Sequence, residues 1–131
     1  MLGITWATIF ALLALLQFMY FGMAVGRARG RHGIDAPAVT GDETFERFHR
    51  AHQNTLEQLV VFIPAIYASA YFAHAWLAIA GGVAFLLGRA WYFRSYIAEP
   101  GSRGPGMMLT FGASAIMIVA ALVGAVSNLL A

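Results

Sequence analysis

Three stretches of this chain contain no aspartate, glutamate, lysine or arginine, and they limit what it can fold into. They cover Met1–Gly26, Gln58–Gly88 and Gly104–Ala131. A helix that crosses a bilayer needs about 20 apolar residues, so the first and third stretches each hold one span. The middle stretch, with its flanking residues, holds two spans separated by a turn at His74. The chain therefore predicts four membrane helices at about Ile4–Val25, Leu56–Phe72, Leu77–Tyr96 and Met107–Leu129.

The composition supports a membrane protein and excludes several other classes. Of the 131 residues, 60% are hydrophobic and only 11% are charged, whereas a soluble domain carries about a quarter charged residues. The expected fold is an all-α, multi-pass integral membrane protein in which residues 1–131 form a single four-helix domain. A net charge of +2 is too small to indicate nucleic-acid binding. Cysteine is absent, so sulfur chemistry would require a thiol from a second molecule.

The basic residues predict how the helices are oriented. All eight are arginines, and they lie in the connections 27–55 and 97–106 or in the adjoining helix ends: Arg27, Arg29, Arg31, Arg47, Arg50, Arg89, Arg94 and Arg103. By the positive-inside rule these connections are cytoplasmic, and both termini face the other side. The all-arginine basic set and the compact connections favour a bacterial inner membrane. Glycines at 30 and 33 are expected to break the first connection, after which Thr40 or Asp42 caps a helix that begins near Glu43 and continues into the second span.

Polar side chains form a stripe where that helix enters the second span. Arg47, Arg50, Asn54 and Glu57 follow one another at steps of three, four and three, which places them on one helix face. One interpretation is a pocket at membrane depth for a zwitterionic or anionic ligand, in which arginine binds carboxylates and Glu57 an ammonium or amide group. The other is an interfacial helix whose charges pair with one another among the lipid headgroups.

A second stripe lies near the end of the third span. Arg89, Tyr92 and Tyr96 share one face, and Arg89 interrupts an apolar run about two turns before the helix ends. An ionisable group at that depth faces the bundle interior and needs a partner, for which Glu57 is the candidate. The tyrosines fit either this pocket or an aromatic belt at the interface, and Arg94 fits the belt. Arg103, in a turn-rich connection, fits either headgroup contact or a use other than helix capping.

Histidine and glycine suggest structure rather than chemistry. His49 and His52 are spaced by three residues, but partnering carboxylates on other helices are missing, so no metal site is expected. Gly81, Gly82 and Gly88 in the third span, and Gly112 in the fourth, favour close helix packing.

Two segments together resemble the signatures of the MAPEG family, the membrane-associated proteins of eicosanoid and glutathione metabolism, which include the microsomal glutathione transferases. The first runs from Thr40 to Glu57 (TGDETFERFHRAHQNTLE), and the second is Gly88–Tyr96 (GRAWYFRSY) followed by Arg103. The resemblance covers essentially the whole chain. His49, His52 and Gln58 depart from the residues common in the family.

The resemblance implies a homotrimer that binds glutathione between neighbouring subunits near the cytoplasmic side. By motif position, the tripeptide would be held by Arg50, Asn54, Glu57, Tyr92 and Tyr96, with Arg89 supporting the pocket and Arg29 contributing from the first connection. Arg103 would stand beside the sulfur as the catalytic residue. Because a free thiol has a pKa near 8.5, a permanently charged arginine would raise the thiolate fraction at neutral pH.

The implied activity is glutathione transfer to hydrophobic electrophiles that arrive through the bilayer, extending to reduction of lipid hydroperoxides and to detoxification. The alternative is a non-catalytic lipid- or partner-binding protein, since the family includes a lipoxygenase-activating member without chemistry. Retention of Arg103 with both tyrosines favours the enzyme.

Overall fold

The computed structural model describes all 131 residues as four long helices and one short turn of 3-10 helix. The elements are α1 (Leu2–His32), α2 (Glu43–Phe72), α3 (Ala75–Ala98), η1 (Pro100–Ser102) and α4 (Gly104–Leu130). Every α-helix is long and apolar enough to cross a membrane. The prediction of an all-α protein with four spans is confirmed, and each predicted span lies within one of these helices.

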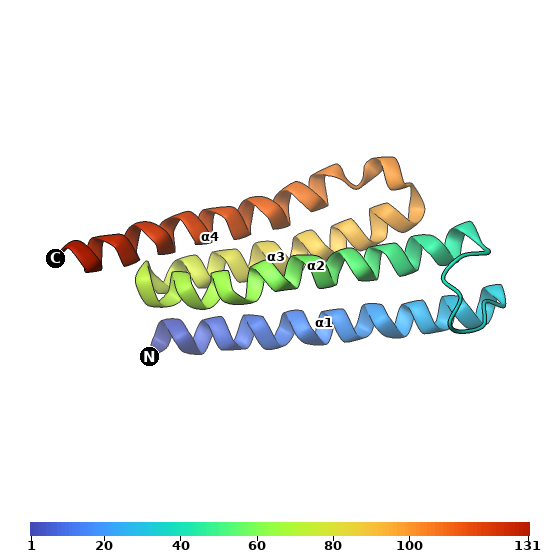
Figure 1. The fold of residues 1–131 in the computed structure, drawn as a ribbon, viewed down its shortest axis with the longest axis horizontal. Helices are drawn as coiled ribbons and strands as arrows, with labels where there is room; N and C mark the ends of the chain where they lie inside the picture. The colour runs from blue at the N-terminus through green and yellow to red at the C-terminus, as the bar shows by residue number, and fades with distance from the viewer.

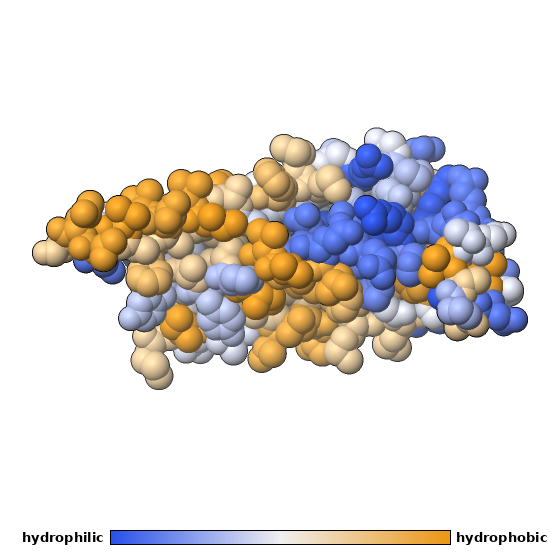
Figure 2. All heavy atoms as spheres, viewed as in Figure 1, coloured by the Kyte–Doolittle hydropathy of each residue, from blue (hydrophilic) through white to orange (hydrophobic).

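The helices form an elongated up-and-down bundle with two different ends (Figure 1). Both termini and the turn between α2 and α3 lie at one end, while the 33–42 connection and η1 lie at the other. Both α1 and α4 pack against α2 and α3. Figure 2 shows that hydrophilic residues gather toward the end with the connection and η1, and that apolar residues dominate the other end.

Helix caps at the two turns follow the sequence closely. Asp42 is the N-cap of α2, and its carboxylate accepts a hydrogen bond from the Phe45 amide at 2.8 Å. His74 caps α3 by accepting from the Trp76 amide at 3.3 Å. The helix expected to begin near Glu43 and to continue into the second span is therefore confirmed.

The break expected at Gly30 is wrong, because α1 runs on to His32 and ends at Gly33 in a left-handed conformation with φ of 67°. One glycine inside a helix costs only about 1 kcal/mol relative to alanine. Buried Val25 and Ala28 pack with Phe45 of α2 and hold this last part of α1 against the bundle. That packing outweighs the glycine penalty.

Small residues bring the helices together in the core. Gly82 abuts the ring of Phe10, Gly81 abuts the Met117 side chain, and Gly88 faces Thr110, so close packing at these three glycines is confirmed. Gly112 has no such neighbour within 4 Å. The prediction of close packing at Gly112 is therefore wrong, because this glycine faces a hollow between α3 and α4.

The backbones of α3 and α4 approach each other closely at Gly106. A methyl group added there would lie 2.8 Å from the Cα atom of Tyr92 and 2.9 Å from the carbonyl oxygen of Gly88. The two helix backbones therefore touch directly. This contact fixes the start of α4 beside the part of α3 that carries the second polar stripe.

Candidate functional site

Arg89 is the centre of a polar network that joins three helices. Its side chain is fully buried. Nη2 donates hydrogen bonds to Asn54 Oδ1 at 2.9 Å and Thr55 Oγ1 at 3.1 Å on α2, and Nη1 donates to Thr110 Oγ1 at 3.5 Å on α4. The guanidinium also lies 4.1 Å from the ring centroid of Tyr92. Arg89 therefore faces the bundle interior and has partners there, as its depth in the span predicts.

The network continues from Asn54 to the rim of the bundle. The Asn54 amide donates to Glu57 at 3.2 Å, and Arg50 donates to the other oxygen of that carboxylate at 3.4 Å. The expected direct pair of Arg89 with Glu57 is wrong, because Asn54 lies between them and bonds to both. Its oxygen accepts from the arginine and its NH₂ donates to the carboxylate, so one amide links both charged groups.

The tyrosines of the second stripe lie next to this network. The rings of Tyr92 and Tyr96 stack at 5.6 Å, with Tyr92 buried and Tyr96 half-buried. Arg50 and Arg103 are cations close to Tyr92. Arg50 and Tyr96 also line an open polar hollow of about 340 Å³ at the end of the bundle. The two sequence stripes thus meet around one space.

Arg103 stands at this end of the molecule with a free side chain. It occupies the N-cap position of α4 and is exposed. Its guanidinium forms no hydrogen bond and no ion pair within the chain. Arg47 differs, because it donates to the carbonyl oxygens of Ile97 and Ala98 and pairs with Glu43 at 2.6 Å. Arg47 therefore ties α2 to the end of α3, whereas Arg103 is available to a ligand.

Arg29 is the one predicted site residue that lies apart from the cluster. It donates to the carbonyl oxygens of Ile34 at 3.2 Å and Ala38 at 2.7 Å, and its guanidinium lies over the Phe45 ring. Within one chain, Arg29 holds the 33–42 connection against α2.

Thr55 and Thr110 were not identified from the sequence. A single threonine in an apolar span normally bonds to its own helix backbone, as Thr55 does to the Ala51 carbonyl oxygen. The sequence pointed to such acceptors only indirectly, since a buried arginine needs more hydrogen-bond acceptors than one carboxylate supplies. No group of three or more histidine, cysteine, aspartate or glutamate side chains is placed to hold a metal ion.

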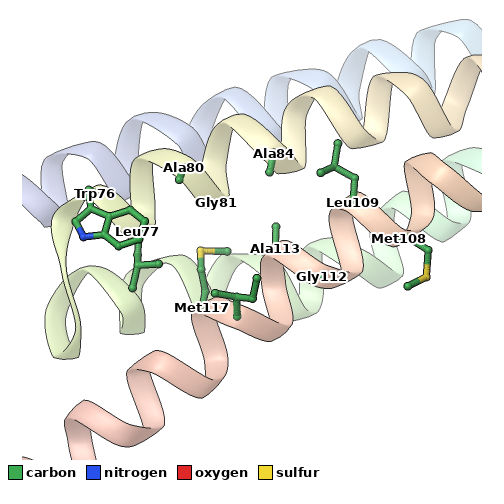
Figure 3. Close-up of a pocket in the computed structure, with 11 residues that line it drawn as sticks. Trp76, Leu77, Ala80, Gly81, Ala84, Met108, Leu109, Gly112, Ala113 and Met117 are labelled. Atoms are coloured by element: carbon green, nitrogen blue, oxygen red, sulfur yellow. The ribbon is translucent and has the colours of Figure 1, made fainter.

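An apolar hollow of about 410 Å³ lies between α3 and α4 (Figure 3). Trp76, Leu77 and Ala84 line it from α3, and Met108, Leu109 and Met117 line it from α4. Met108 is five residues after Arg103, a rise of roughly 7.5 Å along a helix. The hollow therefore begins close to the polar end and follows the bundle toward the apolar end.

The fold and the site define an integral membrane protein with a buried polar network between its helices and open polar and apolar hollows beside it. The chain belongs to the MAPEG family, whose sequence model matches residues 6–123.

Three relatives illustrate the range of similar proteins. Microsomal glutathione S-transferase 2 of Mus musculus is 37% identical over 120 residues, which cover 92% of this chain and 82% of the relative. An uncharacterized protein of Synechocystis sp. is 37% identical over 117 residues, with 89% and 85% covered. Leukotriene C4 synthase of Cavia porcellus is 36% identical over 90 residues, with 69% and 59% covered.

Proposed function

We propose that this protein is a membrane glutathione transferase that activates the glutathione thiol and conjugates it to hydrophobic electrophiles. The observation that carries the proposal is the convergence of Arg50, Asn54 and Glu57 from α2 with Arg89, Tyr92 and Tyr96 from α3. Relatives named as glutathione transferases and as leukotriene C4 synthase support the same chemistry.

The charges at the rim match those of a tripeptide with two carboxylates and one ammonium group. The side chains of Arg50 and Glu57 are 57% and 53% exposed although they contact each other. Each therefore presents part of its charge outward, Arg50 to a carboxylate and Glu57 to the ammonium group. Tyr92 and Tyr96 supply hydroxyl groups beside them. Arg89 and Asn54 act behind this surface, where they hold Glu57 and Tyr92 in place.

Arg103 is assigned the catalytic role because it lies close to Tyr92 at the start of α4 and its guanidinium has no hydrogen bond or ion pair within the chain. A guanidinium near the sulfur stabilises the thiolate without accepting its proton. Each unit by which it lowers the thiol pKa corresponds to about 1.4 kcal/mol of preference for the anion. The thiol proton is released to water, and the thiolate attacks the electrophile. Arg29, whose donors are engaged by carbonyl groups, contributes by holding the first connection.

The second substrate is proposed to be lipophilic, because the apolar hollow between α3 and α4 begins close to Arg103 (Figure 3). A lipid hydroperoxide that reached the same place would be reduced to its alcohol, while two glutathione molecules are oxidised to the disulfide and one water is released. A molecule dissolved in the bilayer would reach the thiolate without crossing water.

We further propose that the protein works as a homotrimer with its polar end in the cytoplasm, and in a bacterium this places it in the inner membrane. The half-exposed Arg50 and Glu57 leave one side of the ligand space open in a single chain, and a neighbouring copy would close it. All eight arginines lie in the half of the bundle that carries the connections 27–55 and 97–106, and the positive-inside rule places this half toward the cytoplasm. Native mass spectrometry of the detergent-solubilised protein tests the assembly, for which three copies are expected.

The experiment that tests the proposed chemistry is glutathione binding followed by thiolate absorbance across pH. The wild-type protein is expected to show a saturable, glutathione-dependent thiolate signal near neutral pH. In Arg103→Ala the midpoint of this signal should rise by about one pH unit or more, while glutathione affinity stays within a few-fold. Arg103→Lys, which keeps the charge, should retain most of the signal.

Three outcomes would contradict the proposal or its assignment of Arg103. Saturable glutathione binding without any thiolate would remove the transferase chemistry and favour a non-catalytic binding protein of the family. Absence of glutathione binding would make both polar stripes structural. Lost affinity in Arg103→Ala with unchanged turnover would assign Arg103 to binding instead of activation.

A further inference from the structure

A groove between α1 and α3, separate from the proposed glutathione site, collects three arginines that have no partner. The groove has a volume of about 370 Å³, and its lining includes Tyr20, Phe21, Arg27, Arg31, Phe93 and Arg94. Arg27 and Arg31 are one helical turn apart on α1, and Arg94 faces them from α3. None of the residues that line the groove is acidic.

These arginines are exposed, and their side chains form no ion pair or hydrogen bond within the chain. The Arg27 guanidinium lies 5.8 Å from the ring centroid of Tyr20, its one recorded side-chain interaction. Three like charges around a single groove repel one another unless an anion lies between them. Arginine donors match a phosphate group geometrically as well as electrostatically. The polar end of the groove therefore fits one phosphate group.

The groove continues from the arginines onto apolar surface, which distinguishes a lipid from a soluble anion. On α1, Leu16, Tyr20, Met23 and Arg27 follow at steps of four, three and four on one exposed face. On α3, Val83, Leu87, Ala90 and Arg94 repeat the same steps, also exposed. Each stripe thus runs from large apolar residues to an arginine. The stacked rings of Phe21 and Phe93, with centroids 3.9 Å apart, join the two helices beneath the groove.

We propose that this groove binds one anionic phospholipid, whose phosphate group lies among Arg27, Arg31 and Arg94 and whose acyl chains lie along the two apolar stripes. Basic pockets between membrane helices on the cytoplasmic side bind anionic headgroups in this way. The site is independent of glutathione, because none of its residues belongs to the proposed catalytic network.

The test is a binding titration of the full-length protein in nonionic detergent with fluorescent phosphatidylglycerol. Phosphatidylcholine and inorganic phosphate serve as competitors. Phosphatidylglycerol is expected to bind saturably, and both competitors should displace it weakly. The double variant Arg27→Gln/Arg94→Gln should weaken binding by about 30-fold. Because both side chains are exposed, this variant should keep the wild-type unfolding temperature.

A control with the same change of net charge separates a defined site from general attraction. Ala38→Asp/Val39→Asp adds two negative charges on exposed residues of the 33–42 connection, outside the groove, and should change the affinity by less than about threefold. The charge-preserving variant Arg27→Lys/Arg94→Lys should lie between wild type and the glutamine variant.

Four results would overturn the proposal. Unchanged phosphatidylglycerol affinity in the glutamine variant would exclude these arginines. An equal loss in the control would indicate general electrostatics without a site. Displacement by inorganic phosphate at comparable affinity would indicate a soluble anion. If the glutamine variant instead changes the number of copies seen by native mass spectrometry, the groove is a contact between subunits and not a lipid site.

Discussion

At the scale of single residues, the buried Arg89 is linked to Glu57 through Asn54, whereas the sequence predicted a direct ion pair between them. Arg89 bonds to one amide and two hydroxyl oxygens, and Asn54 passes the interaction on to Glu57. Neutral acceptors leave the carboxylate free to face outward at the rim. Arg89 therefore contributes both to the stability of the bundle and to the position of a ligand-binding group.

Replacing Arg89 is expected to destabilise the fold strongly. Arg89→Met leaves the buried Oδ1 atom of Asn54 without a donor and removes one hydrogen bond each from Thr55 and Thr110, so the free energy of unfolding should fall by about 2–4 kcal/mol. Thermal unfolding in detergent measures this change. Arg94→Met, on the exposed side of the same helix, is the control and should barely move the transition. Equal effects of the two substitutions would show that the buried network adds no stability.

Double-mutant cycles are expected to trace the route of the network. The coupling energy between Arg89→Met and Asn54→Leu should be about 1–3 kcal/mol, because these side chains contact each other. The pair Arg89→Met and Glu57→Gln should couple less, since Asn54 lies between them. The measurement is unfolding of the two single variants and the double variant in each cycle. A larger coupling for the second pair would restore the direct ion pair.

At the scale of helices, the contact between α3 and α4 brings the two backbones together at a position without a side chain. Gly106 places the backbone of α4 against Tyr92, and this contact brings Thr110 to Arg89. The positions of the site residues on α3 and α4 are therefore set by a steric condition.

Alanine substitution is expected to have different effects at Gly106 and at Gly112, the next glycine along α4. Gly106→Ala is expected to lower the free energy of unfolding by about 1–3 kcal/mol and to weaken glutathione binding, because α4 must move away from Tyr92. Gly112→Ala, which meets no atom within 4 Å, should be neutral or stabilising by up to about 1 kcal/mol. Unfolding and glutathione titration of both variants test the difference. Similar losses in the two variants would show that the close contact is unimportant.

Local patterns predict much of this fold, and contacts between helices account for what they miss. Charge-free stretches located all four spans, and spacing placed Arg50, Asn54 and Glu57 on one face. The sequence did not mark Thr55 and Thr110 as site residues, because their role depends on contact with Arg89 from another helix. Gly112 and Gly106 look alike in the sequence, yet only Gly106 meets a backbone. Which of the two glycines contacts the backbone of α3 depends on how far α4 is shifted along α3, and a local sequence pattern does not contain that shift.

At the scale of the whole molecule, the two ends differ in chemistry, and this difference allows the orientation to be measured. The chain has no cysteine, so single cysteines can be introduced as reporters. Val39→Cys should react with a membrane-impermeant maleimide from the cytoplasmic side, and Ala131→Cys from the opposite side. Labelling of intact cells and of inverted vesicles checks this expectation. The reversed pattern would place the proposed glutathione site outside the cytoplasm.

The length of the helices has a consequence for how the protein responds to bilayer thickness. α1 has 31 residues and α2 has 30, so each is roughly 45 Å long, while the hydrocarbon core is about 30 Å thick. Helix, not loop, therefore continues past the acyl chains into the headgroup region. When the bilayer thickens, lipid covers a further turn of rigid helix without distorting a flexible segment. The polar hollow then lies deeper relative to water while its geometry stays the same, and acyl-chain length becomes a way to tune access to it.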